Sequence, residues 1–246
     1  MAKDEARFME RALDLAESGL GTVWPNPSVG AVIVREGRVV GEGRTQLRGR
    51  PHAEVIALEA AGAAAEGATA YVSLEPCCHW GQTPPCTDAL IRARVARVVV
   101  ACLDPDPRVN GSGIRRLQRA GIQVSTGLLG DRGRQINAGF FARIRLGRPF
   151  VAAIAHAAGI PRTFDALWSR EDQVLIADEA PWLFEFPGQV AVGPGRAFLL
   201  SASPATPKGL QDALRQLAEA GLTRLAISAP SVLSAADVLG ILDEQS

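Results

Sequence analysis

The stretch TAYVSLEPCCHWGQTPPCTDALIRARVARVVVACL, residues 69–103, decides the fold. It opens with Thr69–Leu74, a short apolar run that is typical of a buried strand. Pro84-Pro85 then opens a helix that ends near Arg94, because proline suits the first helical turn. Ala96–Leu103 is a second and clearer strand. A strand, a helix and a strand in succession predict an α/β sandwich in which these late strands run parallel.

The same alternation extends on both sides of this stretch. Upstream we expect a helix over about Asp4–Gly21, a β-hairpin that turns at Glu36-Gly37, and a helix over His52–Ala65. Downstream we expect a short helix near Ser112–Ala120, a strand at Ile122–Gly127, and a helix over about Asp131–Arg145. The chain to this point therefore has the pattern of one complete α/β domain.

The residues around Gly147-Arg148-Pro149 mark a change of character. From about Gly159 to Pro207 the chain is rich in Ala, Pro and Gly, and its periodicity is weak. Beyond it we expect a helix over about Lys208–Ala220, a strand at Thr223–Ser228, and a helical stretch near Ala235–Asp243. We therefore expect two domains, residues 1–147 and 148–246, the second a smaller α/β domain.

Composition limits the classes of function. The 246 residues carry 26 Lys+Arg against 26 Asp+Glu, a formal net charge of +0, and only 5% are aromatic. These values disfavour a nucleic-acid partner, which calls for a basic surface and aromatic stacking platforms. No apolar run is long enough to span a membrane. The acidic N-terminal stretch lacks a signal-peptide core, and four cysteines are too few for a disulfide framework, so we expect a cytoplasmic protein.

The informative chemistry lies in three short motifs. His52-Ala53-Glu54 opens a predicted helix, Pro76-Cys77 follows a predicted strand, and Cys86 precedes the next helix. One imidazole and two thiolates can bind Zn²⁺ and leave the fourth tetrahedral position for water, whose pKa zinc lowers from ~16 towards ~7. Glu54 is then placed to take a proton from that water and pass it to a leaving amine. Zinc nucleobase deaminases share this set in the order H-x-E…P-C-x-x-C, but here eight residues separate the two cysteines.

The remaining cysteines and histidines have weaker claims to a chemical role. Cys78 adjoins a proposed ligand, and two adjacent cysteines rarely bind one metal, so it is expected to lie beside the site. Cys102 lies in an apolar strand and is expected in the core. His79 stands in the loop between the two ligand cysteines, where a substrate contact and a solvated side chain are equally consistent with the sequence. His156 is expected to be structural.

Residues 1–147 resemble the deaminase domain of the bifunctional, RibD-type riboflavin-biosynthesis deaminase/reductase family. The matching stretches are PNPSVGAVIV, PHAEVIAL, ATAYVSLEPCCHWGQTPPC, RVVVACLDPDPRVNGSGI and INAGFFAR. The resemblance implies a cytidine-deaminase-like three-layer α/β/α domain with a mixed central sheet. It also implies one zinc per chain on His52, Cys77 and Cys86, with Glu54 as the proton shuttle. The implied reaction is hydrolytic removal of an amino group from a diaminopyrimidine ribosylamino phosphate, with release of ammonia.

The resemblance also implies a substrate pocket. Asn26 and the backbone around Ala53 would hold the pyrimidine, and His79 would lie near the ribose phosphate. Three residues at the phosphate end depart from the family pattern: Thr45 replaces a histidine, Arg50 replaces an acid, and Gln82 replaces a lysine or arginine. We therefore count Thr45, Arg50 and Gln82 among the candidate substrate contacts, with Arg50 supplying a replacement cation from the opposite loop.

The second domain resembles a shortened family reductase. RPFVAAIAHAAG (148–159) occupies the start of the reductase, and LRQLAEAGLTRLAISAPSVL (214–233) is similar to its last helix–strand unit. Ile154 replaces an expected lysine, and Ser228–Ser231 replaces a Gly-Gly turn of the kind that lets backbone amides approach a pyrophosphate. We therefore expect no NADPH binding and no reductase activity.

Other functions remain open at this stage. The changes at Thr45, Arg50 and Gln82 are compatible with deamination of a different pyrimidine, pterin or purine-like heterocycle, with or without a phosphate. A catalytically decayed, zinc-stabilised scaffold or regulator is a further alternative, suggested by the degenerate second domain. We expect a small-molecule substrate, no membrane or nucleic-acid partner, and assembly into a homodimer or homotetramer.

Overall fold

The computed structural model describes residues 2–153, 166–170, 173–176, 189–192, 195–199 and 207–227. The chain forms two compact units, Met1–Asn137 and Ala138–Ser246. Ile154, His156, Ser228–Ser231 and the helical stretch expected near Ala235–Asp243 lie outside the described residues. None of the helices in the described ranges combines the length and the apolar character that crossing a membrane requires.

The first unit is built on a mixed sheet of five strands in the order β2-β1-β3-β4-β5. Its strands are β1 (Gly30–Arg35), β2 (Arg38–Arg44), β3 (Thr69–Leu74), β4 (Arg97–Cys102) and β5 (Gln123–Thr126). β1 runs antiparallel to β2 and β3, whereas β3, β4 and β5 run parallel. The predicted parallel pair and hairpin are thus confirmed. Glu36 and Gly37 both have positive φ, 51° and 74°, as a two-residue turn matched to the strand twist requires.

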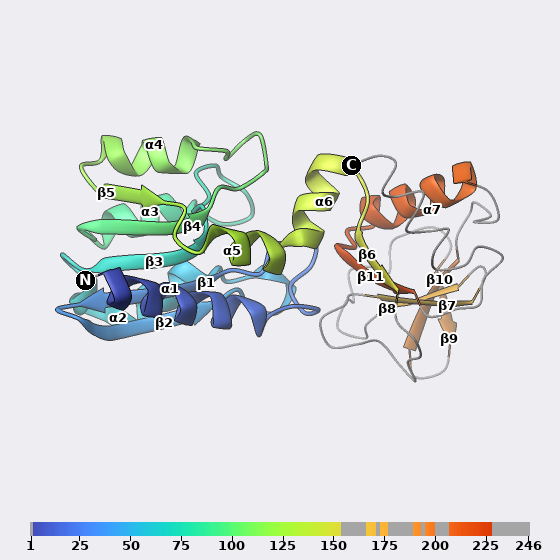
Figure 1. Ribbon diagram of the computed structural model, residues 1–246, viewed down its shortest axis with the longest axis horizontal. Coiled ribbons are helices and arrows are strands. Elements are labelled where there is room, and N and C mark those ends of the chain that lie inside the picture. Colours follow the sequence, from blue (N-terminus) through green and yellow to red (C-terminus); the bar gives the residue numbers. More distant parts are fainter. Residues whose placement is uncertain are drawn as a thin grey trace. The chain divides into compact units, whose positions relative to one another are not determined.

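Helices cover both faces of this sheet. The helices are α1 (Ala2–Glu17), α2 (Ala53–Ala61), α3 (Cys86–Arg92), α4 (Ser112–Arg119) and α5 (Gly130–Ile136), with 3₁₀ turns at Leu47–Gly49 and Gly62–Ala65. α1 and α5 pack on one face, and α2, α3 and α4 lie together on the other (Figure 1). The predicted three-layer α/β/α arrangement is therefore present.

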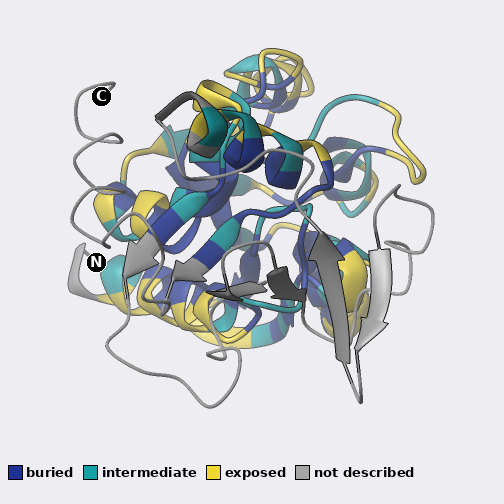
Figure 2. Cartoon of the chain, turned by 90° about the vertical axis from the view of Figure 1, so that its right-hand side faces the viewer, coloured by how far each residue is buried: buried dark blue, intermediate teal, exposed yellow. Residues whose placement is uncertain are grey.

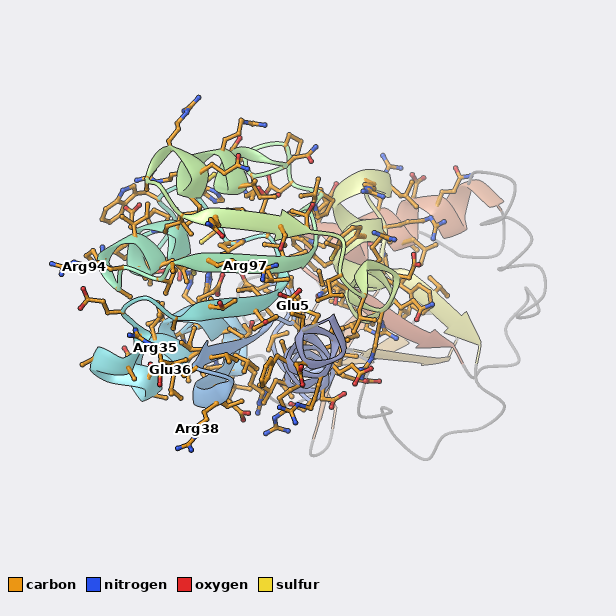
Figure 3. All side chains as sticks on the ribbon, turned by 60° about the vertical axis from the view of Figure 1, so that its left-hand side comes forward. Glu5, Arg35, Glu36, Arg38, Arg94 and Arg97 are labelled. Atoms are coloured by element: carbon orange, nitrogen blue, oxygen red, sulfur yellow. The ribbon has the colours of Figure 1, made fainter. Side chains whose placement is uncertain are left out.

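The core follows from the alternation of side chains along the strands. On the α1 face, Met9 and Leu13 are fully buried against Val32, Tyr71 and other strand residues. Figure 2 shows the buried residues gathered on the strands and on the inward sides of the helices. At the start of β4, Arg97 donates to Glu5 of α1 and, at 3.0 Å, to Ser125 of β5 (Figure 3). This ion pair ties α1 to the amino ends of the parallel strands.

Two glycines in β2 allow α2 to lie directly on the sheet. A Cβ placed on Gly41 would stand 2.2 Å from the Ala57 carbonyl oxygen, and one on Gly43 would stand 2.4 Å from that of Ala53. Both distances are far inside van der Waals contact, so no side chain fits between the strand and the helix backbone. The amino end of α2 is therefore held at a fixed height above β2.

The second unit has its own mixed sheet of six strands in the order β6-β11-β7-β8-β10-β9. The strands are β6 (Phe150–Ala153), β7 (Ala166–Arg170), β8 (Gln173–Ile176), β9 (Gln189–Val192), β10 (Gly195–Leu199) and β11 (Arg224–Ile227). β11 is parallel to β6 and β7, and the remaining pairs are antiparallel. The helices α6 (Ala138–Leu146) and α7 (Pro207–Glu219) belong to this unit, which buries Leu214, Leu217 and Leu225.

Two expectations about secondary structure are corrected. The sequence predicts one helix over Asp131–Arg145, but the structure has α5 and α6 separated at Asn137, whose backbone (φ −94°, ψ 19°) leaves the helical range. The break coincides with the division between the compact units. The weakly periodic region from Gly159 to Pro207 contains the four short strands β7 to β10, for which no element was predicted.

Candidate metal centre

The three predicted zinc ligands come together at the carboxyl end of β3. His52 directly precedes α2, Cys77 follows β3, and Cys86 is the first residue of α3. Within the described residues, their ligand atoms all lie within 4.8 Å of one another. His52 Nδ1 is 3.2 Å from Cys86 Sγ and 3.7 Å from Cys77 Sγ. Nitrogen and sulfur ligands on a tetrahedron around zinc stand about 3.6 Å apart, so the geometry and the chemistry of this donor set fit that ion.

Two helix starts position these ligands. His52 is extended (φ −72°, ψ 157°) and ends the preceding loop, so its ring stands beside the first turn of α2. Pro85 is also extended (ψ 144°) and makes Cys86 the first helical residue of α3. Both helices therefore begin at the metal centre.

Hydrogen bonds favour the thiolate form of Cys77. The Cys86 side chain, the His52 ring and the Cys86 backbone N–H, whose nitrogen lies 3.2 Å from Cys77 Sγ, together lower the pKa of Cys77 well below its ordinary value. The hydrogen bond to the Cys77 thiolate, together with burial, raises the pKa of Cys86. The pair thus holds a negative charge centred on Cys77, which suits a divalent cation.

Glu54 lies in the first turn of α2 and is only 4% exposed. Burial raises the pKa of its carboxyl, while the nearby His52 charge acts in the opposite direction. A carboxyl with a raised pKa beside a metal site can accept a proton and return it near neutral pH. Glu54 lies two residues after His52 and is hydrogen-bonded to the Cys86 side chain, but it is not one of the three grouped ligand candidates among the described residues.

Arg50 joins the two loops that border the metal centre. Its Nε donates to Gln82 Oε1 at 3.2 Å, and its Nη1 donates to Thr83 Oγ1 at 2.7 Å. Nη1 also lies 3.3 Å from His52 Nε2. The structure thus brings the candidate residues Arg50 and Gln82 together beside a ligand histidine.

The other candidate substrate residues lie in different surroundings. Asn26 is close to Gly49, and its Nδ2 donates to the Arg48 carbonyl at 3.4 Å. Ala53 is buried, and its carbonyl faces Gly43. Thr45 is also buried, and its hydroxyl exchanges hydrogen bonds with both backbone groups of Val29. The Thr45 hydroxyl is therefore already hydrogen-bonded to Val29. The Asn26 side chain instead contacts the loop of Arg48 and Gly49.

The remaining histidine and cysteines of the first unit are also placed. His79 is half-buried, and its Nδ1 is a buried atom without a hydrogen-bond partner in the described part of the chain. Cys78 Sγ donates to the Arg108 carbonyl at 3.7 Å, and burial raises the pKa of this thiol. Cys102 is buried in β4, and burial raises its pKa to about 12. Neither Cys78 nor Cys102 belongs to the ligand group found among the described residues.

Glu75 holds the loop that joins β4 to α4, and the sequence interpretation assigned it no role. Its carboxylate is buried and accepts backbone N–H groups from Asp104, Gly111, Gly113 and Ile114 at 3.3, 2.8, 3.0 and 3.3 Å. The last two donors belong to the first turn of α4, which favours a negative charge. A lone acid ending an apolar strand two residues before a ligand is the signal that could have identified it.

Comparisons with known proteins agree with this geometry. The sequence profile of the cytidine and deoxycytidylate deaminase zinc-binding region matches residues 2–102. The riboflavin biosynthesis protein RibD of Escherichia coli (strain K12) is 53% identical over 173 residues, which cover 70% of this chain and 47% of that protein. A diaminohydroxyphosphoribosylamino-pyrimidine deaminase of Buchnera aphidicola subsp. Acyrthosiphon pisum (strain APS) is 49% identical over 142 residues, 58% of this chain and 97% of that one.

The fold likeness extends over both units. A solved RibD structure of Acinetobacter baumannii (form 2) superposes with a TM-score of 0.73 and 30% identity, covering 99% of this chain and 84% of that one. The chain nevertheless spans only about half the length of the curated RibD protein of Escherichia coli, 47%. The likeness to the Buchnera protein thus concerns almost all of that protein, whereas the likeness to curated RibD concerns a part.

Proposed function

Because the chain belongs to the family of RibD-type riboflavin-biosynthesis deaminases, we propose that it is a zinc-dependent aminohydrolase. The substrate we propose is the diaminohydroxyphosphoribosylaminopyrimidine intermediate, which would lose one amino group as ammonia. The observation that carries the proposal is the grouping of His52, Cys77 and Cys86 with the buried Glu54 at the carboxyl end of β3.

The residues divide the chemistry between them. His52, Cys77 and Cys86 would hold one zinc ion per chain, and zinc supplies a Lewis acid that makes water ionisable near neutral pH. Glu54 would take the proton that the attacking water loses, hold it on its carboxyl because burial raises the pKa, and deliver it to the departing nitrogen, which leaves as ammonia. The backbone of Ala53 and the side chain of Asn26 would orient the flat pyrimidine, so that the amino-bearing carbon faces Glu54.

The phosphate end of the substrate would lie against Arg50, Gln82 and His79. Within the described chain Arg50 contacts Gln82, Thr83 and the His52 ring, none of which is a carboxylate, and a guanidinium suits phosphate geometry. The orphaned Nδ1 of His79 offers a further polar group in the loop between the cysteines. Thr45 would act on this end through the loop it holds, since its hydroxyl is engaged by Val29.

The test is ammonia release from the phosphorylated diaminopyrimidine by the wild type and by Glu54→Gln. We expect Glu54→Gln to lose about 10²-fold or more of the rate, the usual contribution of a positioned acid–base group, while it keeps its zinc. An active Glu54→Gln protein would contradict the proposal. Zinc binding without turnover by the wild type on any diaminopyrimidine or purine substrate would favour a scaffold instead.

A second candidate function is deamination of a different heterocycle. It is favoured by the single observation that Arg50 and Gln82, both departures from the family pattern, are hydrogen-bonded to each other beside His52. Turnover of the phosphorylated substrate is to be compared with that of its dephosphorylated form, of guanine and of cytosine. Preference for the phosphorylated form would retire this alternative. We also propose a cytoplasmic homodimer or homotetramer without NADPH binding, which light scattering and NADPH titration would test.

A further inference from the structure

Arg50 lies beside Nε2 of His52, the ring nitrogen that points away from the two cysteines. His52 turns Nδ1 toward the two cysteine sulfurs, at 3.2 and 3.7 Å, and Nε2 toward Arg50 Nη1, at 3.3 Å. Nδ1 is therefore the ring atom placed for the metal, and Nε2 is the atom that the surroundings must satisfy.

The hydrogen-bonding capacities of the two groups conflict once Nδ1 binds a metal. A neutral imidazole that ligates through Nδ1 carries its proton on Nε2, and this N–H is ordinarily donated to a carboxylate, a carbonyl or water. A guanidinium has donors only and keeps its charge at every working pH. Two N–H groups would thus face each other across 3.3 Å, with a fixed positive charge on the far side of the ring.

Other contacts hold the guanidinium in this place. Gln82 Oε1 accepts from Nε and Thr83 Oγ1 accepts from Nη1, both from the loop between the two ligand cysteines. Among the described residues, the side-chain contacts of Arg50 are with Gln82, Thr83 and His52 and include no carboxylate, so its charge is not offset there. The repulsion toward a cation on Nδ1 is therefore not cancelled locally.

We propose that Arg50 is a positioning residue that lowers the affinity of the His52–Cys77–Cys86 site for zinc. A hydrogen-bond acceptor at the same position would accept the Nε2–H hydrogen bond and raise the affinity of the site for zinc. The inference rests on the proposed function to the extent that zinc is the metal bound here.

The experiment measures the zinc dissociation constant of the full chain by competition with a chromophoric chelator. Arg50→Glu is expected to bind zinc about 10-fold or more tightly than the wild type, the usual size of such an outer-partner effect. Arg50→Gln, whose amide oxygen accepts but is a poor zinc ligand, is expected to lie between them, which separates an outer partner from a new fourth ligand. Arg50→Lys, which keeps a charged donor, is expected to stay near the wild type.

The matched control is Arg48→Glu, which makes the same charge change in the same loop. Arg48 contributes its backbone carbonyl to Asn26, and we expect a much smaller change in zinc affinity. Equal tightening by Arg48→Glu, or unchanged or weaker zinc binding by both Arg50→Glu and Arg50→Gln in folded protein, would overturn the inference. Because the effect is a gain in affinity, a variant that merely disturbs the fold cannot imitate it.

The outcome also separates the inference from the proposed function. If the wild type bound no zinc, the proposed function would fail. The inference would then stand only if Arg50→Glu bound zinc, and it would fall if neither protein did.

Discussion

Asn137 engages the backbone of Ser28 in both directions. Its Oδ1 accepts the Ser28 N–H at 2.8 Å, and its Nδ2 donates to the Ser28 carbonyl at 2.9 Å. Both residues are buried, and 109 positions separate them in the sequence. Ser28 closes the loop that carries Asn26 and leads into β1, so the last residue of the first unit fixes the start of its sheet.

Removing this side chain should destabilise the first unit. Asn137→Ala would leave a buried N–H and a buried carbonyl of Ser28 without partners, at a cost of about 2–4 kcal/mol in the free energy of unfolding. Urea unfolding followed by circular dichroism measures the change. Asn110→Ala, at an exposed position, is the control and should change stability little. Equal effects of the two substitutions would show that the pairing with Ser28 contributes nothing.

Zinc content should depend on Cys86 and not on Cys102. Cys86→Ser removes one of three ligands, and the purified protein is expected to lose its metal, measured by atomic absorption. Cys102→Ser is the matched control, since its sulfur donates to the Ser73 carbonyl, a bond that a hydroxyl can also make. Retention of a full zinc equivalent by Cys86→Ser would remove this cysteine from the ligand set.

Glu75 should be needed for stability, although it touches no ligand atom. In Glu75→Gln one carboxylate oxygen becomes an NH₂ group that faces backbone N–H donors from the loop and α4. We expect a loss of about 2–3 kcal/mol in thermal or urea unfolding, the cost of leaving buried donors unpaired. Glu66→Gln breaks only the exposed pair with Arg94 and should cost less than about 1 kcal/mol. A Glu75→Gln protein as stable as the wild type would refute this role.

Asp104 should make stability depend on pH. Burial raises the pKa of its carboxyl to about 7, so between about pH 4 and pH 7 the folded protein keeps a proton that the unfolded chain has released. The contribution of Asp104 to the free energy of unfolding therefore falls as pH rises through this window and stays low above it.

Asp104→Asn should remove that dependence, because an amide oxygen can still accept the Asp106 N–H. At pH 8 the variant is expected to be more stable than the wild type by roughly 1–4 kcal/mol, and the difference should shrink toward pH 4. Asp131→Asn, whose side chain is 92% exposed, is the control. A constant difference between variant and wild type across the pH range would contradict the assignment.

The sequence was informative where local chemistry dictates structure. Glu36-Gly37 predicts a turn because those residue types tolerate the positive φ that the hairpin adopts. His52, Cys77 and Cys86 could be identified because their order and chemical types together suit one metal. These signals need no knowledge of distant contacts.

The sequence was uninformative where a distant partner decides. Apolar residues such as Ile136, Phe140 and Phe141 continue the helical pattern across Asn137, and the local sequence carries no sign of the buried hydrogen bonds that Asn137 makes with Ser28. Similarly, the charge of Arg50 is visible in the sequence, but its approach to His52 depends on how two loops meet. The short strands β7 to β10 lack a strong local pattern and become recognisable through their pairing.

The contact between β2 and α2 has a consequence for how this protein can diverge. Because Gly41 and Gly43 leave no space beneath α2, any side chain added there would displace His52 and Glu54 together. The hairpin and the helix can therefore be exchanged between related proteins only as one module. The loops that carry Asn26, Arg50 and Gln82 lie outside that contact, so their side chains can change without moving α2.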